Sequence, residues 1–227
     1  MPPEKRKWAE MAAIPFFDPH FHIWDISAAS QTGHEPTNLF APCGKEVYLR
    51  SDYEAEFAAL PPGLKHAGGV FIEAVSVCHA GLSGPEYSKH CLAETRFAVE
   101  ELRNGPYVIV GTCALEQGDA SEVLQALAKE PMFRGIRQIL NYEPSFPRNG
   151  KLGELLDNAE WKKGFAMLHG LGLSFDMQIN PNQYEKAASF LTEFPDTTVI
   201  IDHIGTPKLA DLTENADAYW RGMEALA

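Results

Sequence analysis

The feature that most constrains the fold is an alternation of short apolar runs with helical patterns, repeated six times. Each run is apolar in its middle on both faces, as in parallel strands that are covered by helices. The runs are Ile14–Phe17, His66–Val77, Tyr107–Leu115, Phe133–Leu140, Leu173–Ile179 and Thr197–Gly205. The clearest helical patterns are Pro85–Leu102, Asp119–Glu130, Asn158–Gly172 and Asn180–Phe194. Alternation of this kind predicts a parallel sheet with crossover helices.

Two arrangements of such a sheet compete, an open doubly wound sheet and a barrel. A doubly wound sheet usually has a glycine-rich phosphate-binding turn after its first strand, whereas this chain has "HFHIWD" there. Polar residues stand instead at the C-terminal ends of the runs: Asp18, His20, His22, Glu73, Arg137, Gln178, Asp202 and His203. In an α/β barrel these ends converge on one active-site mouth. We therefore predict a single, partial (β/α)8-type (TIM-barrel) domain over residues 1–227, incomplete at about six parallel strands.

Composition and charge exclude several classes of function. The chain has 227 residues, with 19 Lys+Arg against 31 Asp+Glu, and a net charge of −12. Such an acidic chain without a basic patch does not suit nucleic acid, and no apolar run is long enough for a signal peptide or a membrane span. The four cysteines lack metal-site spacing and read as reduced thiols. We expect a cytoplasmic protein whose partner is a small molecule.

The segment "IPFFDPHFHIWDI" places two histidines at the end of the first apolar run. Because side chains on a strand alternate between faces, Asp18, His20 and His22 are expected to share one face. On the inside of a barrel, both imidazoles would converge on one metal ion or one substrate carbonyl. The alternative is that the two histidines are surface-loop residues just beyond the strand.

The motif "FFDPHFHIWD" resembles the first strand of the amidohydrolase-related family of the amidohydrolase superfamily. "FRGIRQIL" and "TTVIIDHIGTP" are similar to its fourth and sixth strands, and "SFDMQINPNQ" looks most like its lactonase branch. The family includes sugar-acid and pyrone-dicarboxylate lactonases and a decarboxylase on a (β/α)8 barrel. The resemblance implies that His20 and His22 bind a metal or polarise the scissile carbonyl. It also implies that His203 lies beside the reacting carbonyl.

Three further residues are predicted to bind substrate. Arg137 would pair with a substrate carboxylate, since a guanidinium fork binds one bidentately; the alternative is a salt bridge to a neighbouring acid. Trp24 would wall the pocket, or is ordinarily buried. Gln178 stands where metal-dependent members carry a fifth-strand histidine, and glutamine is a poor zinc ligand. We therefore expect no required cofactor, or one weakly bound divalent ion, zinc, at His20 and His22.

The chain departs from the family pattern after the sixth strand. Only 24 residues follow His203, which is too few for two more β/α units of about 30 residues each. The eighth-strand aspartate, which activates water in the family, is therefore expected to be missing. General-base assistance is typically worth about 10²–10⁴-fold in rate, so hydrolysis is expected to be impaired. Two uncovered sheet edges would favour a homo-oligomer.

These observations predict a hydrolase, of the lactonase type, that acts on a small acidic lactone. Two alternatives stay open at this point. One is a truncated, catalytically silent relative that serves as a binding or assembly module, which the missing aspartate favours. The other is a metal-dependent decarboxylase, against which Gln178 argues.

Overall fold

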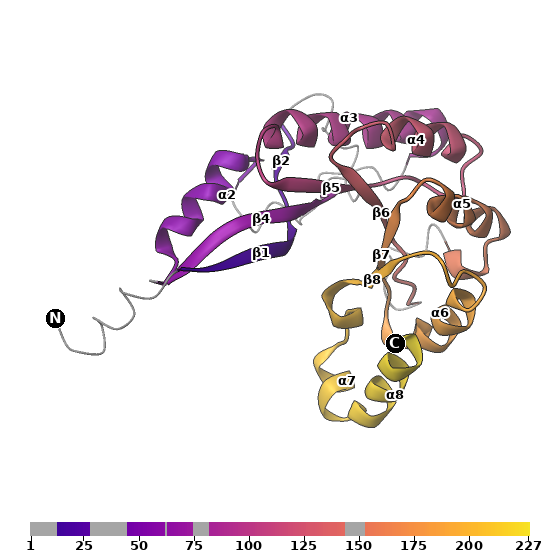
Figure 1. Ribbon diagram of the computed structural model, residues 1–227. Helices are drawn as coiled ribbons and strands as arrows, with labels where there is room; N and C mark the ends of the chain where they lie inside the picture. The colour runs from indigo at the N-terminus through magenta and orange to yellow at the C-terminus, as the bar shows by residue number, and fades with distance from the viewer. Residues whose placement is uncertain (1–12, 28–44, 62, 75–81, 144–152) are drawn as a thin grey trace. The chain divides into compact units, whose positions relative to one another are not determined.

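The computed structural model describes residues 13–27, 45–61, 63–74, 82–143 and 153–227 (Figure 1). These residues belong to two compact units. Unit 1 takes its residues from 1–82 and 90–110, and unit 2 takes its residues from 83–89 and 111–227. Each unit contributes three parallel strands, so the predicted α/β alternation is present in both. The single domain over residues 1–227 stays a prediction.

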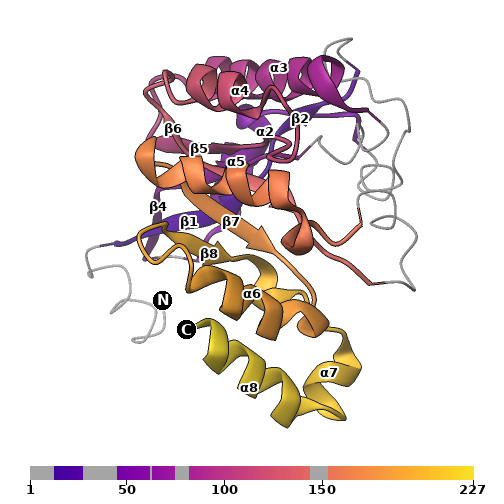
Figure 2. The same ribbon diagram turned by 90° about the vertical axis from the view of Figure 1, so that its right-hand side faces the viewer.

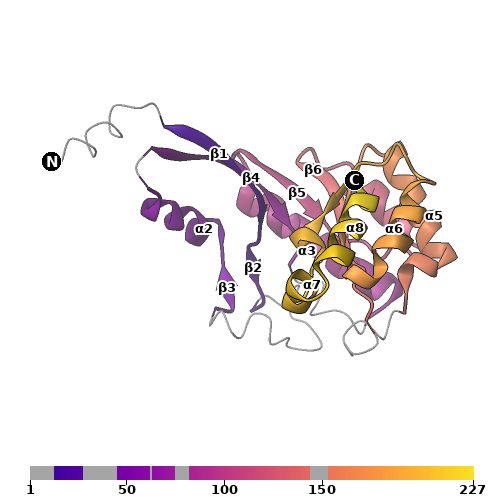
Figure 3. The same ribbon diagram turned by 90° about the horizontal axis from the view of Figure 1, so that it is seen from below.

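Unit 1 is built on three parallel strands and a short antiparallel ribbon. Its main strands are adjacent in the order β1 (Ile14–Phe21), β4 (Leu64–Ile72) and β5 (Tyr107–Gly111). The ribbon pairs β2 (Trp24–Asp25) with β3 (Val47–Tyr48). It leads into α2 (Arg50–Glu56) and η2 (Phe57–Ala59), as Figure 3 shows. Helix α3 (Gly84–Leu102) lies between β4 and β5 in the chain. The end of the predicted strand His66–Val77 lies outside the described residues.

The centre of the unit 1 sheet is apolar on both faces, as the sequence predicts for covered parallel strands. Phe71, Ile72 and Ile109 have no solvent exposure. Strand β4 approaches its neighbours so closely that Gly68 has no room for a side chain. A Cβ there would lie 2.7 Å from the Phe17 ring, and the φ of +146° is one that favours glycine.

Strand β1 contains a bulge where the histidine motif begins. Asp18 pairs with Gly69 and Phe21 pairs with Phe71, so three steps along β1 match two steps along β4. The Asp18 carboxylate accepts a hydrogen bond from the backbone amide two residues ahead, at 3.1 Å, across Pro19. Such an Asx turn, together with a proline that donates no amide, accommodates the extra residue.

The bulge overturns one expectation about this strand. Asp18 accepts a hydrogen bond from the Tyr53 hydroxyl at 2.8 Å, and Phe21 stacks on the same Tyr53 ring at 4.1 Å. Asp18 therefore shares a partner with Phe21, three positions further along the bulged strand. The prediction that Asp18 shares a face with the two histidines is wrong, because the extra residue reverses the alternation between them.

Unit 2 repeats the strand–helix pattern. Its strands are adjacent and parallel in the order β6 (Phe133–Ile139), β7 (Ser174–Gln178) and β8 (Val199–Ile201). The helices of this unit are α4 (Ala120–Leu127), α5 (Ala159–Gly170), α6 (Tyr184–Leu191), α7 (Leu209–Thr213) and α8 (Ala216–Leu226). Single turns η4 (Leu155–Asp157), η5 (Pro181–Gln183) and η6 (Asp202–Gly205) connect them. Figure 2 shows β7 and β8 side by side, and α6 next to α8. The predicted helix Asn180–Phe194 is divided into η5 and α6.

An aromatic core fixes the strands of unit 2 against its helices. Trp161, Phe165 and Phe175 are fully buried and meet at ring-centroid distances of 5.2–5.7 Å. The Trp161 indole N–H donates to the Gln138 side chain at 2.8 Å. Asn158, the first residue of the predicted helical pattern, caps α5, and its side-chain oxygen accepts hydrogen bonds from the amides of Glu160 and Trp161. Because Gln138 faces this helical layer, its neighbour Arg137 points to the opposite face of the sheet.

Candidate active site

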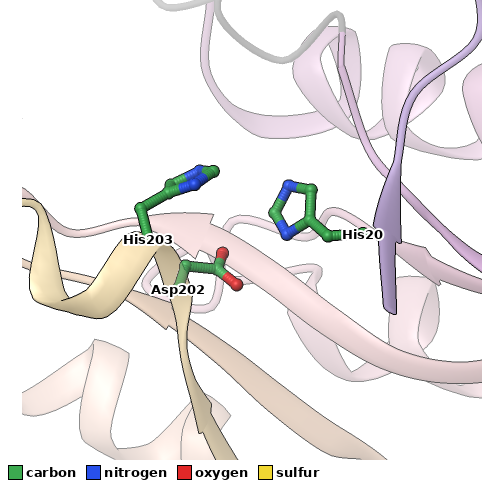
Figure 4. A group of neighbouring side chains, drawn as sticks. All are labelled: His20, Asp202 and His203. Atoms are coloured by element: carbon green, nitrogen blue, oxygen red, sulfur yellow. The ribbon is translucent and has the colours of Figure 1, made fainter. Parts of the chain in front are cut away.

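The two motif histidines of unit 1 point their ring nitrogens at each other. His20 is the next-to-last residue of β1, and Figure 4 draws its side chain; His22 follows the strand. Their Nε2 atoms are 3.2 Å apart. The Nδ1 atom of His22 lies 2.8 Å from the carbonyl oxygen of Ile72, at the end of β4. Both imidazoles are half-buried.

This geometry sets the chemistry of the pair. A carbonyl oxygen only accepts hydrogen bonds, so Nδ1 of His22 carries the proton and donates it to Ile72. In the neutral ring, Nε2 of His22 then offers a lone pair toward Nε2 of His20. A tetrahedral zinc ion with Zn–N bonds of about 2.0–2.1 Å holds two nitrogens about 3.3 Å apart. The observed 3.2 Å separation therefore fits a shared metal ion or a shared proton. A backbone carbonyl on the second ring nitrogen is a common support for a metal-bound histidine.

A buried network supports the strand that carries the pair. The Tyr53 hydroxyl donates to Asp18 and lies 3.3 Å from Nε2 of His66. Burial and the Asp18 carboxylate raise the pKa of Tyr53, so this hydroxyl stays protonated. Burial lowers the pKa of His66. Because Asp18 also holds the backbone amide of His20, the network fixes the backbone on which the first histidine stands.

Trp24 follows the motif on β2. Its indole N–H donates to the carbonyl of Lys45 at 3.1 Å, and its ring stacks on Tyr48 with centroids 4.9 Å apart. The side chain is half-buried. These contacts anchor the ring in the β2–β3 ribbon, and its role as a pocket wall stays a prediction.

In unit 2, the third histidine lies in an unusual turn directly after β8. Asp202 is buried and His203 is exposed, and Figure 4 shows their side chains projecting from consecutive positions. His203, Ile204, Gly205 and Thr206 have φ values of 50°, 50°, 77° and 47°. The left-handed conformation costs roughly 1–2 kcal/mol for each residue other than glycine. Such strain persists only where the surroundings hold it, and it concentrates at functional sites.

Part of the restraint on this turn comes from Thr206. Its hydroxyl donates to the carbonyl of Ile179 and accepts a hydrogen bond from the Asn141 side chain at 2.8 Å. Its backbone amide donates to the carbonyl of His203 at 3.0 Å. Thr206 therefore ties the far end of the turn to the segments that follow β6 and β7.

Arg137 and Gln178 occupy neighbouring strands of the same unit. Arg137 is on β6, beside the buried Asp176 of β7, and its Nη1 atom lies 3.8 Å from the carboxylate of Asp202. The alternative that the sequence left open for Arg137, an ion pair with a neighbouring acid, is thus present, and its binding of a substrate carboxylate stays a prediction. Gln178 is the last residue of β7, and its side chain is half-buried.

Asp202 is a site candidate that the sequence analysis placed at a strand end but did not assign a role. His20, Asp202 and His203 each carry a nitrogen or carboxylate oxygen that suits a divalent cation. The signal that would have pointed to Asp202 is its position immediately before His203. Its buried pairing with Arg137 is a tertiary contact over 65 residues that no local pattern encodes.

The amidohydrolase family model matches residues 17–227. The chain belongs to the amidohydrolase family. Among curated proteins it is 26% identical over 226 residues to the uncharacterized protein y4mH of Sinorhizobium fredii, covering 96% of this chain and 70% of that protein. It is 24% identical over 136 residues to the L-fucono-1,5-lactonase of Burkholderia ambifaria, covering 59% of this chain and 44% of the lactonase.

Solved structures confirm the predicted fold class. The structure of an amidohydrolase from Burkholderia multivorans with bound zinc is similar to this chain, with a TM-score of 0.66 and 18% identity. The match covers 94% of this chain and 66% of the Burkholderia chain. A probable 2-pyrone-4,6-dicarboxylic acid hydrolase from Acinetobacter baumannii, with citric acid bound, is similar with a TM-score of 0.62 and 14% identity. This match covers 93% of this chain and 66% of the hydrolase chain. The chain thus spans about two thirds of these structures. By fold class the chain is therefore an incomplete amidohydrolase-type barrel, with three of its parallel strands in each unit.

The remaining predictions concern a metal ion, the location of the protein and its oligomeric state. Zinc is bound in one similar structure, and this chain has histidine and aspartate side chains of the kind that bind it. None of the described helices is both long enough and apolar enough to cross a bilayer. The cytoplasmic location and the homo-oligomeric state stay predictions.

Proposed function

We propose that this protein is a lactonase-type hydrolase that opens a small acidic lactone. In this reaction water adds to the ring carbonyl, the ring C–O bond breaks, and a hydroxy acid forms. The observation that carries the proposal is the His20–His22 pair, whose Nε2 atoms are 3.2 Å apart in a chain of the amidohydrolase family. The similarity to an L-fucono-1,5-lactonase supports a lactone as the substrate.

In the proposed site, His20, His22 and His203 act on the carbonyl oxygen. As water attacks, negative charge develops on this oxygen, and the proton shared by the His20–His22 pair and the N–H group of His203 would stabilise that charge. The fixed Nδ1–H tautomer of His22 and the restrained turn around His203 keep these rings oriented before the substrate arrives. Orientation that is set in advance lowers the barrier without reorganisation during the reaction.

The donor set also fits one weakly bound divalent ion, which the His20–His22 pair would hold, with Asp202 and His203 as further candidate ligands. When bound, a zinc ion polarises carbonyl groups as a Lewis acid and makes bound water more acidic. Arg137 would bind the acidic group of the substrate, while Trp24 and Gln178 would contact the rest of it. The guanidinium group suits a carboxylate because its planar fork matches the two oxygens.

The test is an assay of sugar-acid and dicarboxylate lactones with the wild type, His203→Ala and the control His169→Ala. His169 is an exposed histidine of α5 whose Nδ1 lies 2.8 Å from a backbone carbonyl, so its loss tests the effect of removing any histidine. We expect ring opening above the buffer rate in the wild type and the control. Loss of one carbonyl-stabilising donor typically costs about 10²–10³-fold in kcat, and we expect this loss in His203→Ala.

Other outcomes would replace the proposal. Equal rates for the wild type and His203→Ala would remove His203 from the mechanism. Lactone binding without turnover would favour the binding-module alternative. Release of carbon dioxide from aromatic carboxylic acids would favour a decarboxylase, a class represented among the similar structures by the 2,6-dihydroxybenzoate decarboxylase from Rhizobium, which has a TM-score of 0.55.

A further inference from the structure

The left-handed turn that carries His203 is held by two tyrosine hydroxyl groups. Tyr219, on α8, donates to the carbonyl of Ile204 at 2.9 Å. Tyr184, at the start of α6, donates to the carbonyl of Gly205 at 2.8 Å. These two carbonyls belong to the first two peptide groups after the one that joins His203 to Ile204.

Both tyrosines are buried and closely packed. Tyr184 is 1% exposed and Tyr219 is 3% exposed. Helices α6 and α8 pack against each other, as Figure 2 shows. Two glycines make room for Tyr184, because a Cβ on Gly205 would lie 2.1 Å from its hydroxyl oxygen and a Cβ on Gly222 2.5 Å from its ring. Burial raises the pKa of Tyr184, so its hydroxyl remains a donor across the physiological pH range.

Hydroxyl donors at these two positions act directly on backbone conformation. A peptide group is planar, so fixing the direction of its carbonyl fixes the orientation of the whole unit. The two held peptide groups flank Gly205 and restrict its dihedral angles. The Thr206 amide holds the carbonyl of His203 on the other side of Ile204, so the three contacts together restrict how the chain leaves His203. Ile204 is β-branched and is strongly disfavoured in the left-handed region, so the turn requires such external restraint.

We propose that Tyr219, assisted by Tyr184, is a positioning residue that holds the His203 turn in its left-handed form and thereby aims the His203 imidazole and the Asp202 carboxylate. This inference rests on the proposed hydrolase function for its catalytic consequence. The conformational consequence, a turn that depends on the tyrosine hydroxyls, is independent of any activity.

The test compares Tyr219→Phe with Tyr107→Phe. Each change removes one hydroxyl from a buried tyrosine, but the Tyr107 hydroxyl donates to Glu54 in unit 1, at 2.8 Å. Backbone NMR chemical shifts of His203 and Ile204 report the conformation of the turn in both variants. Steady-state kinetics on a lactone that the wild type opens report the catalytic effect. A misplacement of about 1 Å can cost on the order of 10²-fold in rate.

We expect Tyr219→Phe to shift the resonances of His203 and Ile204 and to lower kcat by about 10–100-fold with little change in KM. Tyr107→Phe should leave the resonances and kcat unchanged. Unshifted resonances in Tyr219→Phe, or an equal loss of kcat in both variants, would overturn the inference. If Tyr219→Phe does not fold, Tyr184→Phe provides the same comparison. If the wild type opens no lactone, the proposed function fails, and the NMR comparison alone decides whether the tyrosines hold the turn.

Discussion

Replacing Gly205 by alanine tests the packing of the His203 turn. Gly205 has a φ of +77°, and an alanine Cβ would lie 2.1 Å from the hydroxyl oxygen of Tyr184 and 2.7 Å from its ring carbon Cζ. Gly172 offers a matched control after α5. Its φ is +67°, but no atom lies within 4 Å of the position that a Cβ would take. The two variants therefore share the cost of the left-handed conformation and differ in the collision with Tyr184.

The expected magnitudes follow from these contacts. Alanine in the left-handed region costs about 1–2 kcal/mol, and this is the whole expected effect of Gly172→Ala. Gly205→Ala adds about 1–3 kcal/mol for overpacking. It also displaces the Tyr184 hydroxyl from the Gly205 carbonyl, which costs about 1 kcal/mol. The total for Gly205→Ala is about 3–6 kcal/mol.

Thermal unfolding followed by circular dichroism measures both variants. For a chain of this size, 1 kcal/mol corresponds to roughly 2–4 °C in Tm. Gly172→Ala should lower Tm by a few degrees, and Gly205→Ala should lower it by roughly 6–24 °C. Equal shifts in the two variants would show that Tyr184 does not occupy the space above Gly205, which would refute the packing of the turn.

Three further predictions concern pH, charge and assembly. Burial holds the pKa of His66 below its usual 6.5 in the folded state, so the unfolded state binds more protons between the two pKa values. The stability contributed by neutral His66 is therefore present above pH 6.5 and is lost as the pH falls toward the folded-state pKa. His66→Asn should flatten the dependence of the unfolding free energy on pH in this window. An unchanged slope would contradict this prediction. Arg137→Met removes the cation beside buried Asp202 and should destabilise the protein by about 3–5 kcal/mol in urea unfolding, a loss that Arg137→Met/Asp202→Asn should partly restore. Analytical ultracentrifugation should find a homo-oligomer, and a monomer at every concentration would disprove that prediction.

Much of the fold could be predicted because it depends on local periodicity. Runs that are apolar on both faces specify covered parallel strands, and each of the six predicted runs overlaps a strand. The pairing of His20 with His22 also follows from the two-residue period of a strand. The contact that holds the bulged segment could not be predicted, because the Tyr53 hydroxyl that donates to Asp18 lies 35 residues away in the sequence.

The restraints on His203 were equally hidden from the sequence. Tyr219 lies in a helical pattern of α8, where a tyrosine is usually read as a packing residue, and nothing local shows that its hydroxyl reaches Ile204. For Arg137 the sequence left open both a substrate contact and an ion pair with a neighbouring acid, but it could not identify that acid. Its ion pair with Asp202 joins two strand ends that only the folded sheet brings together.

The most direct test of the central claim is a calorimetric titration of zinc into the wild type, His20→Ala, His22→Ala and the control His169→Ala. If the nitrogens that lie 3.2 Å apart form a ligand pair, the wild type and His169→Ala should each bind one zinc ion with the same affinity. His20→Ala and His22→Ala should each bind zinc at least about 100-fold more weakly. Loss of a group that hydrogen-bonds to a metal ligand typically lowers metal affinity by about 10–100-fold, and loss of the ligand itself should cost more. Wild-type affinity in both motif variants would contradict the claim that His20 and His22 form the core of the site.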